Sequence, residues 1–311
     1  MIHIAAYRLL QAGLVALMVG ALTFILVRSL PGDMAYRIAA GRYGYDLVDT
    51  AAAELVRQQL GLGQPVLIAL GQWIWDLVRF DLGVSLVSGA PVVEEIRHQL
   101  GHSLDLAMTA VALSLLIGPP IGILAGLRPG SIFDRIAFIA SVGLRALPQF
   151  VIGLLLIYAL SVWAGLLPAA GHGGARHALL PALTLALGLA AVSSRVARNA
   201  TIAVTESAYY RFGRSKGLSA AENFRLHGLR NVAVPVVTYL GVQLVYLIEG
   251  VVVVETLFAW PGIGHALVHA VVARDVTMIQ GTALVMGLMF VVLNAAVDFA
   301  CFLIDPRRKS A

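Results

Sequence analysis

The sequence predicts an all-α integral membrane protein, and three features of its 311 residues support this prediction. The mean hydropathy is +0.86. Only 13% of the residues are charged, whereas about 25% is usual in a soluble domain. Six apolar segments are each long enough to cross a bilayer, which takes about 20 residues in a helix. A chain this apolar cannot cover a water-facing surface with polar groups, so lipid is its expected solvent.

The six predicted spans follow one another along the chain. They are Leu9–Leu30, Ser103–Leu127, Ile136–Trp163, Leu179–Val196, Val232–Val254 and Ile279–Ile304. The first is longer than the apolar region of a secretory signal, which has about 7–15 residues, so we expect an uncleaved helix. The third contains Pro148, which removes a backbone donor and predicts a kink near Arg145–Gln149. In the second, small residues recur at Gly118, Gly122 and Gly126, a spacing that permits close helix contact.

The basic residues predict that both termini are cytoplasmic. With the N-terminus inside, 13 of the 22 Lys and Arg residues fall in the cytoplasmic segments, which are also much shorter in total than the outside segments. These basic residues lie between apolar runs and not on a water-soluble face, so nucleic acid is not an expected partner.

The first long connection, from Pro31 to His102, is predicted to be a helical extracytoplasmic insertion. One short helix is expected over Ala51–Leu60, and another begins at Pro65 and ends near Asp81-Leu82-Gly83. Trp73 and Trp75, two residues apart, cannot share one helix face and suit a membrane interface. The insertion is acidic, and it serves either as a solvated cap over the channel mouth or as a docking surface for a partner.

The second long connection, Arg195 to Arg230, is basic, mostly helix-forming and interrupted at Gly213 and Gly217. It is the best candidate for a coupling element on the cytoplasmic side. The predicted organisation is therefore the first span with its insertion over residues 1–102, a core membrane domain over residues 103–305 and a short cytoplasmic tail over residues 306–311.

Motifs for enzymatic chemistry are missing from the sequence. No G-x-x-x-x-G-K-[ST] loop is present to hold a nucleotide, and neither H-E-x-x-H nor G-x-S-x-G occurs. The lone cysteine, Cys301, lies in the last apolar run and excludes an intrachain disulfide. The histidines near the predicted membrane surfaces are expected to be ordinary polar residues. We expect neither an enzyme nor a cofactor or metal bound by this chain.

Four charged residues lie within or at the ends of the predicted spans: Arg145, Glu249, Glu255 and Asp298. A charge at the centre of a membrane helix costs about 2.5–3.5 kcal/mol, so these side chains are expected to face protein or water. Arg145, Glu249 and Asp298, together with Pro148, are candidates for lining a translocation path. A structural ion pair between helices explains the charges equally well, and Glu255 is better explained by a position at headgroup depth.

Two neighbouring segments carry a family resemblance. The segment Tyr209–Ser219 reads YYRFGRSKGLS, and His227–Thr238 reads HGLRNVAVPVVT. Together they resemble the cytoplasmic coupling motif of ABC importer permeases of the peptide/nickel branch. Phe212, Gly213 and Ser215 replace small residues usual in that motif, and we expect Gly213 to loosen the first coupling helix.

Shorter matches extend the resemblance over nearly the whole chain, and their order and spacing are more specific than any one of them. They are Leu30–Asp33, Leu60–Leu62, Asp81–Ser85, Pro91–Val92, Pro148–Phe150, Leu167–Gly171, Val254–Gly264, Ala273–Asp275, Asp298 and Asp305–Arg307.

The resemblance implies the six-helix type I ABC importer permease fold in a bacterial or archaeal inner membrane. It implies a second homologous permease, usually a different one, two cytoplasmic ATPases that carry ATP and magnesium, and an extracytoplasmic solute-binding protein. Dipeptides, oligopeptides, opines, glutathione and nickel chelates are the solutes of such systems. Residues implied in ATPase coupling are Tyr210, Arg211, Arg214, Lys216, Gly217, Leu218, Arg230, Asn231 and Pro235. Gly217 is expected to take left-handed dihedrals at the turn between the two helical pieces.

Two other classes of function are weighed against a permease. A secondary transporter or channel uses intramembrane charges without an ATPase, and it often shows two similar halves, which this sequence lacks. An intramembrane protease needs a nucleophile with a partner histidine, and no histidine accompanies Ser193 and Ser194 at membrane depth.

Overall fold

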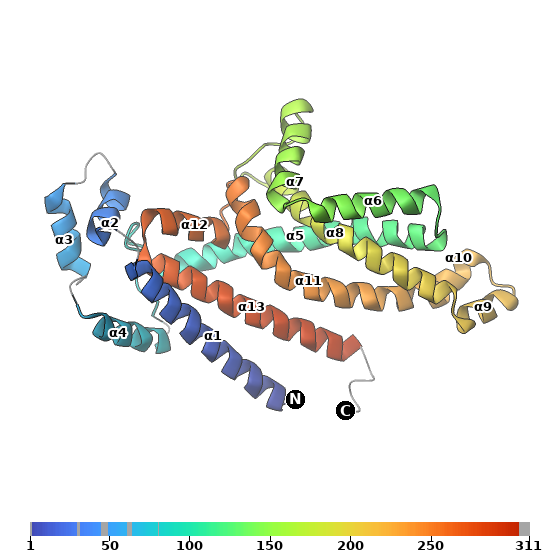
Figure 1. Cartoon of the computed structure of the whole chain (residues 1–311), viewed down its shortest axis with the longest axis horizontal. Helices are drawn as coiled ribbons and strands as arrows, with labels where there is room; N and C mark the ends of the chain where they lie inside the picture. Colours follow the sequence, from blue (N-terminus) through green and yellow to red (C-terminus); the bar gives the residue numbers. More distant parts are fainter. Residues whose placement is uncertain (1, 30–31, 45–48, 61–63, 80, 305–311) are drawn as a thin grey trace. The chain divides into compact units, whose positions relative to one another are not determined.

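The computed structural model describes residues 2–29, 32–44, 49–60, 64–79 and 81–304. These residues are almost entirely helical, and the one β-bridge among them joins Val84 to Pro91. The helices, labelled in Figure 1, are α1 (Ile2–Ser29), α2 (Met34–Tyr43), α3 (Thr50–Leu60), α4 (Val66–Val78), α5 (Val92–Leu127), α6 (Ile132–Ala146), α7 (Gln149–Leu156), the π-helix η2 (Ile157–Trp163), α8 (Ala175–Thr205), α9 (Ala208–Ser215), α10 (Ala220–Asn223), the π-helix η3 (Phe224–Gly228), α11 (Leu229–Leu257), α12 (Ile263–Ala273) and α13 (Val276–Ile304).

Three helices of the described chain are long and apolar enough to cross a membrane: α5, α8 and the part of α13 over Val276–Ala296. A fourth span results if α6 and the α7–η2 segment are taken as one broken helix. Over its described residues α1 supplies a shorter apolar stretch, Leu10–Leu26. The all-helical prediction is therefore confirmed.

The predicted kink at Pro148 is confirmed as a bend of 110° between α6 and the α7–η2 segment. Leu147 has extended dihedrals of −83° and 134°, as expected for a residue that precedes proline. Pro148 then forms the N-cap of α7, where its missing N–H costs nothing. In Figure 1, α7 turns away from the line of α6 at this point.

The chain divides into two compact units, Met1–Ser103 with Pro261–Val292, and Leu104–Trp260 with Leu293–Ala311. The division places residues 261–292 with the N-terminal part, whereas the sequence assigns them to the core domain. The first unit thus joins the predicted insertion to α12 and the start of α13.

In the first unit, α2 and α3 pack through a small apolar core that includes Ile38 and Val56, both fully buried. The predicted helices over Ala51–Leu60 and after Pro65 are confirmed as α3 and α4. On α4, Trp73 packs against Phe24 of α1, with ring centroids 6.5 Å apart, whereas Trp75 is 57% exposed. The two tryptophans therefore face different sides, as their spacing predicts.

A buried carboxylate fastens the loop after α4 to the start of α13. Asp275 is 3% exposed and accepts hydrogen bonds from the Ser85 hydroxyl and from the backbone N–H of Leu86 at 3.1 Å. It also accepts from the N–H of Met278 at 3.2 Å, so it caps α13. Both halves of this contact belong to motifs that carry the family resemblance, Asp81–Ser85 and Ala273–Asp275.

The glycine ladder of α5 lies directly against α8 in the second unit. A Cβ atom on Gly118 would lie 2.1 Å from Ser193 Oγ, and one on Gly122 would lie 2.1 Å from the Ser194 carbonyl oxygen. Real Cβ atoms do not approach other atoms this closely, so only glycine permits the contact. The close packing predicted from the small-residue spacing is confirmed.

Candidate coupling site and membrane cavity

The candidate coupling site is the elbow between α8 and α11, which we define as residues 205–235. Figure 1 shows α9 and α10 at the end where α8 and α11 meet. Ser207 begins α9, with its hydroxyl oxygen accepting from the Tyr210 N–H at 3.4 Å. A serine N-cap satisfies a backbone donor that the first helical turn leaves without a partner.

The turn after α9 depends on Gly217, whose φ is +88°. The Gly217 N–H donates to the Arg214 carbonyl at 3.0 Å, which ends α9. Left-handed backbone is costly for residues with a Cβ atom, so the sequence prediction for Gly217 is confirmed at the level of backbone geometry. A Cβ atom added at Gly217 would meet no other described atom within 4 Å, so the requirement is conformational and not steric.

A capping box begins the second helical piece. The Ser219 hydroxyl accepts from the Glu222 N–H at 3.3 Å, and the Glu222 carboxylate accepts from the Ser219 N–H at 3.1 Å. The hydrogen bonds from the Ser219 side chain and backbone lower the pKa of the Glu222 carboxyl. Its contribution to stability is therefore present at neutral pH and is lost as the pH falls through that lowered pKa.

Asn223 ties the two helical pieces of the elbow together. Its side chain is fully buried, and its Nδ2 donates to the Tyr210 carbonyl at 2.9 Å. A Cβ atom on Gly213 would lie 2.1 Å from Asn223 Oδ1. Gly213 lies inside α9 and lets α10 approach, so the structure gives it a packing role in place of the expected loosening of the helix.

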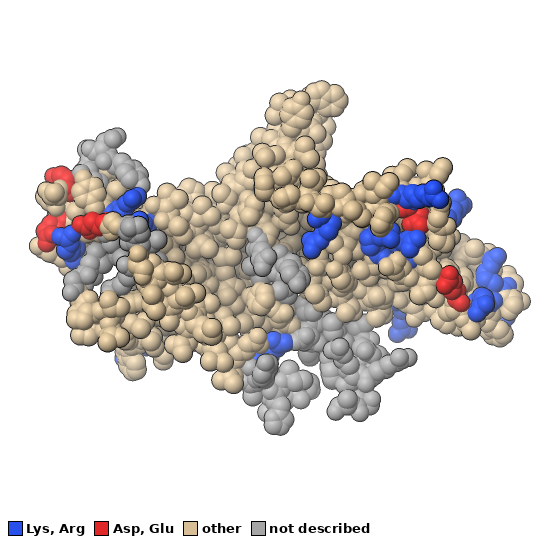
Figure 2. Space-filling view, in the orientation of Figure 1, with Lys and Arg blue, Asp and Glu red and all other residues tan. Residues whose placement is uncertain are grey.

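The outer surface of α9 is basic and aromatic. Arg211, Arg214 and Lys216 are exposed, Phe212 is 61% exposed, and the Lys216 ammonium lies 4.7 Å from the Phe212 ring centroid. Tyr210, which the resemblance placed among the coupling residues, is instead buried in an apolar cluster. The cluster contains Ala197, Val204, Val232, Val236 and Leu240. In Figure 2, blue Lys and Arg residues gather at this end of the second unit.

The remaining coupling candidates lie on the return path into α11. Leu218 is half-buried after the turn, and its carbonyl accepts from Arg214 at 3.0 Å. Arg230 and Asn231 are exposed, and Asn231 Nδ2 donates to the His227 carbonyl at 2.7 Å. Pro235 is half-buried inside α11.

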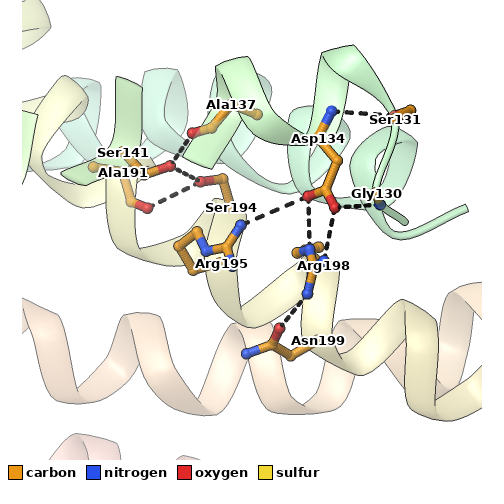
Figure 3. Close-up of polar contacts among 10 residues, drawn as sticks. All are labelled: Gly130, Ser131, Asp134, Ala137, Ser141, Ala191, Ser194, Arg195, Arg198 and Asn199. Carbon is orange, nitrogen blue, oxygen red and sulfur yellow. Dashed lines mark hydrogen bonds and ion pairs between the residues drawn. The ribbon is translucent and has the colours of Figure 1, made fainter. Parts of the chain in front are cut away.

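A buried ion pair joins α6 to α8 close to the elbow (Figure 3). Asp134 is 4% exposed and accepts two hydrogen bonds of 2.7 Å from Arg198. The Gly130 N–H donates to the same carboxylate at 2.9 Å, and Arg195 Nη1 lies 3.8 Å from Asp134 Oδ1. A two-pronged guanidinium–carboxylate pair is strong and directional, so it fixes the approach of α6 to α8. Sequence reasoning missed Asp134, although Ser131-x-x-Asp134 matches a capping-box pattern.

A cavity of about 360 Å³ lies at the α6–α7 bend in the second unit. Arg145 and Pro148 line it, so the structure brings these two candidate path residues together. Gln149 and Gln243 also line the cavity, although neither is among the path residues that the sequence predicts. The side chains of Glu249 and Asp298, the other two path candidates, lie outside the described residues.

Glu255, for which we expect a position at headgroup depth, is fully buried within the protein. It lies near the end of α11 beside the apolar cluster that contains Phe258 and Trp260. Among the residues of the chain that the structure describes, no group of three or more His, Cys, Asp or Glu side chains is placed to hold a metal ion.

Comparisons with known proteins agree on one family. Residues 118–310 match the family described as "Binding-protein-dependent transport system inner membrane component". The chain is 38% identical to the "Putative peptide transport system permease protein" of Brucella abortus (strain 2308), over 96% of each chain. It is also 38% identical to the glutathione transport system permease protein of Escherichia coli (strain K12), over 93% of this chain and 92% of that protein.

Two solved structures have a similar fold. One is an amino acid ABC transporter, with a TM-score of 0.54 over 67% of this chain and 94% of that chain. The other is the methionine ABC transporter MetNI in an inward-facing conformation, with a TM-score of 0.57 over 68% of this chain and 96% of that chain. Both are 17% identical in sequence, so they support the fold alone. The family match and the two relatives identify this chain as a member of the binding-protein-dependent transport system inner membrane component family, the permease component of an ABC importer.

Proposed function

We propose that this chain forms half of the translocation path for peptides or related small solutes. In this proposal it crosses an inner membrane six times, has both termini in the cytoplasm and carries its insertion on the outer side. It pairs with a second, homologous permease, and two ATPases and an extracytoplasmic binding protein complete the importer. ATP and magnesium belong to the ATPases, and this chain contributes no catalytic group. The solute is a dipeptide, an oligopeptide, an opine, glutathione or a nickel chelate; the names of the relatives support peptides and glutathione.

The observation that carries the proposal is the construction of the elbow. Its inner side is rigid, because Asn223 bonds to the Tyr210 backbone and Gly213 permits close packing. Its outer side presents Arg211, Phe212 and Lys216, which suit an acidic and apolar groove on an ATPase. A rigid element that binds the ATPase through its outer surface transmits the movement of the ATPase to the membrane helices, whereas a flexible loop would not.

Movement of the elbow would be passed to the membrane helices that are joined to it. The elbow is continuous with α8 and α11, and the Asp134–Arg198 pair fastens α8 to α6. Closure of the ATPases on ATP would therefore move α6, α8 and α11 as a group and bias the permease pair toward its outward-open state. Hydrolysis would reset it.

Substitution of Gly217 tests this coupling. In Gly217→Arg, a side chain at φ +88° strains the turn and displaces the outer surface of α9. We expect uptake by the reconstituted importer to fall at least about tenfold, as a loss of about 1.4 kcal/mol of productive coupling requires. The amount of protein inserted in the membrane should stay unchanged.

Gly165→Arg is the matched control, because Gly165 also has a positive φ of +63° and open space around its Cβ position but lies outside the elbow. It should transport as the unmodified chain does. Normal uptake by Gly217→Arg would show that the turn does not transmit the motion.

A further inference from the structure

We propose that the cavity at the α6–α7 bend is a binding subsite for the carboxylate of the transported solute, with Arg145 as its anionic-group receptor. This inference rests on the proposed function, because it names the chemical group that the translocation path recognises. The cavity is formed within the second unit by the end of α6, the start of α7 and the facing parts of α8 and α11.

The polar groups of the cavity are one guanidinium and two amides. The exposed Arg145 lines the cavity together with Gln149, Gln243 and apolar residues such as Phe150, Leu189 and Leu247. Arg145 is the charged residue among the described residues that line the cavity. A mainly apolar pocket with a few converging polar groups is typical of a small-molecule site, and the volume of about 360 Å³ falls in the usual range of about 300–1,000 Å³.

Both amide side chains belong to residues that line the cavity. Gln243 is 5% exposed, yet it borders the cavity. Gln149 Oε1 is buried without a hydrogen-bond partner among the described residues. Space for Gln149 comes from Gly250, where a Cβ atom would lie 2.1 Å from Oε1. A buried polar group without a partner costs free energy, so a ligand that supplies a donor to Gln149 is favoured.

This set of groups matches the end of a peptide. A guanidinium binds a carboxylate through two parallel hydrogen bonds, and the Gln243 amide can donate a third. The Gln149 carbonyl can accept from the last amide N–H of the same peptide. A free metal cation is disfavoured by Arg145, so a metal would pass only within an anionic chelate. The structure therefore selects solutes that end in a free carboxylate.

The test compares free-acid and amidated solutes in the complete importer. Proteoliposomes containing both permeases, both ATPases and ATP are given the binding protein with trialanine, dialanine and their C-terminal amides, and initial uptake is measured by mass spectrometry. Arg145→Gln should reduce uptake of the free acids about tenfold or more relative to the unmodified complex, because a hydrogen bond to a charged group is lost. Uptake of the amides by Arg145→Gln should differ less than about twofold from uptake by the unmodified complex, because the amides have no carboxylate to bind Arg145.

Arg135→Gln is the matched control, because Arg135 is an exposed arginine on the same helix and does not line the cavity. It should leave all uptake unchanged, and Arg145→Lys should be intermediate. If Arg145→Gln lowers acid and amide uptake by the same factor, or changes neither, the subsite is overturned while the importer function stands. If the unmodified complex takes up none of the four solutes, the proposed peptide function falls and the subsite falls with it.

Discussion

At the scale of single residues, the side chains that position the site are buried polar groups that form hydrogen bonds between separate segments. Asp134 accepts from Arg198 and Gly130, Asp275 accepts from Ser85, Leu86 and Met278, and Asn223 donates to Tyr210. Each joins segments that are distant in sequence or separated by a turn. A buried charge is costly unless it is fully paired, so these residues hold their helices in one arrangement.

Removal of Asp134 leaves Arg198 without its carboxylate. We expect Asp134→Ala to destabilise the protein by about 2–3 kcal/mol, somewhat less than for a fully buried pair because the Arg198 side chain is 21% exposed. The apparent melting temperature of the detergent-solubilised protein should fall. Glu206→Ala, which removes an exposed carboxylate at the end of α8, should leave it unchanged. Equal melting temperatures for the two variants would show that the pair contributes no stability.

At the scale of elements, two glycines inside helices differ in whether a larger side chain would fit. Gly213 in α9 faces Asn223 so closely that no Cβ atom fits, whereas Gly143 in α6 has open space around its Cβ position. Glycine in a helix interior is usually less stable than alanine by about 0.5–1 kcal/mol. The same substitution should therefore have opposite signs at the two positions.

Gly213→Ala should destabilise the elbow by about 1–3 kcal/mol through overpacking. Hydrogen–deuterium exchange should show faster exchange of the α9 and α10 amides, because the two helices separate. Gly143→Ala should leave exchange of α6 unchanged or slower. Slower exchange in both variants would mean that helix propensity, and not the contact with Asn223, governs these positions.

The elements were more predictable from sequence than the contacts between them. Apolar length and Pro148 predicted the long helices and the bend, because these depend on local composition and on backbone sterics. Gly217 was predicted because a left-handed turn follows from the residue type. The positions of Tyr210 and Gly213 were not predicted, because they depend on Asn223 ten or more residues away. The sequence did not predict that Gln149 and Gln243 line one cavity, because only the bend brings them together.

At the scale of the whole molecule, the second unit connects an exposed basic elbow to a cavity at a broken helix through α8 and α11. The features that the structure describes in this unit are an exposed basic elbow, two long helices continuous with it and a cavity of about 360 Å³. The chain is a permease component, and the proposal makes its movement dependent on the ATPases.

The most direct test of this central claim is solute uptake with and without the ATPases. The two permeases are reconstituted in proteoliposomes with the binding protein and trialanine or glutathione outside. We predict accumulation against a gradient only when the ATPases and ATP are present, and none with the permeases alone or with a non-hydrolysable nucleotide. Accumulation by the permeases without the ATPases would contradict the account.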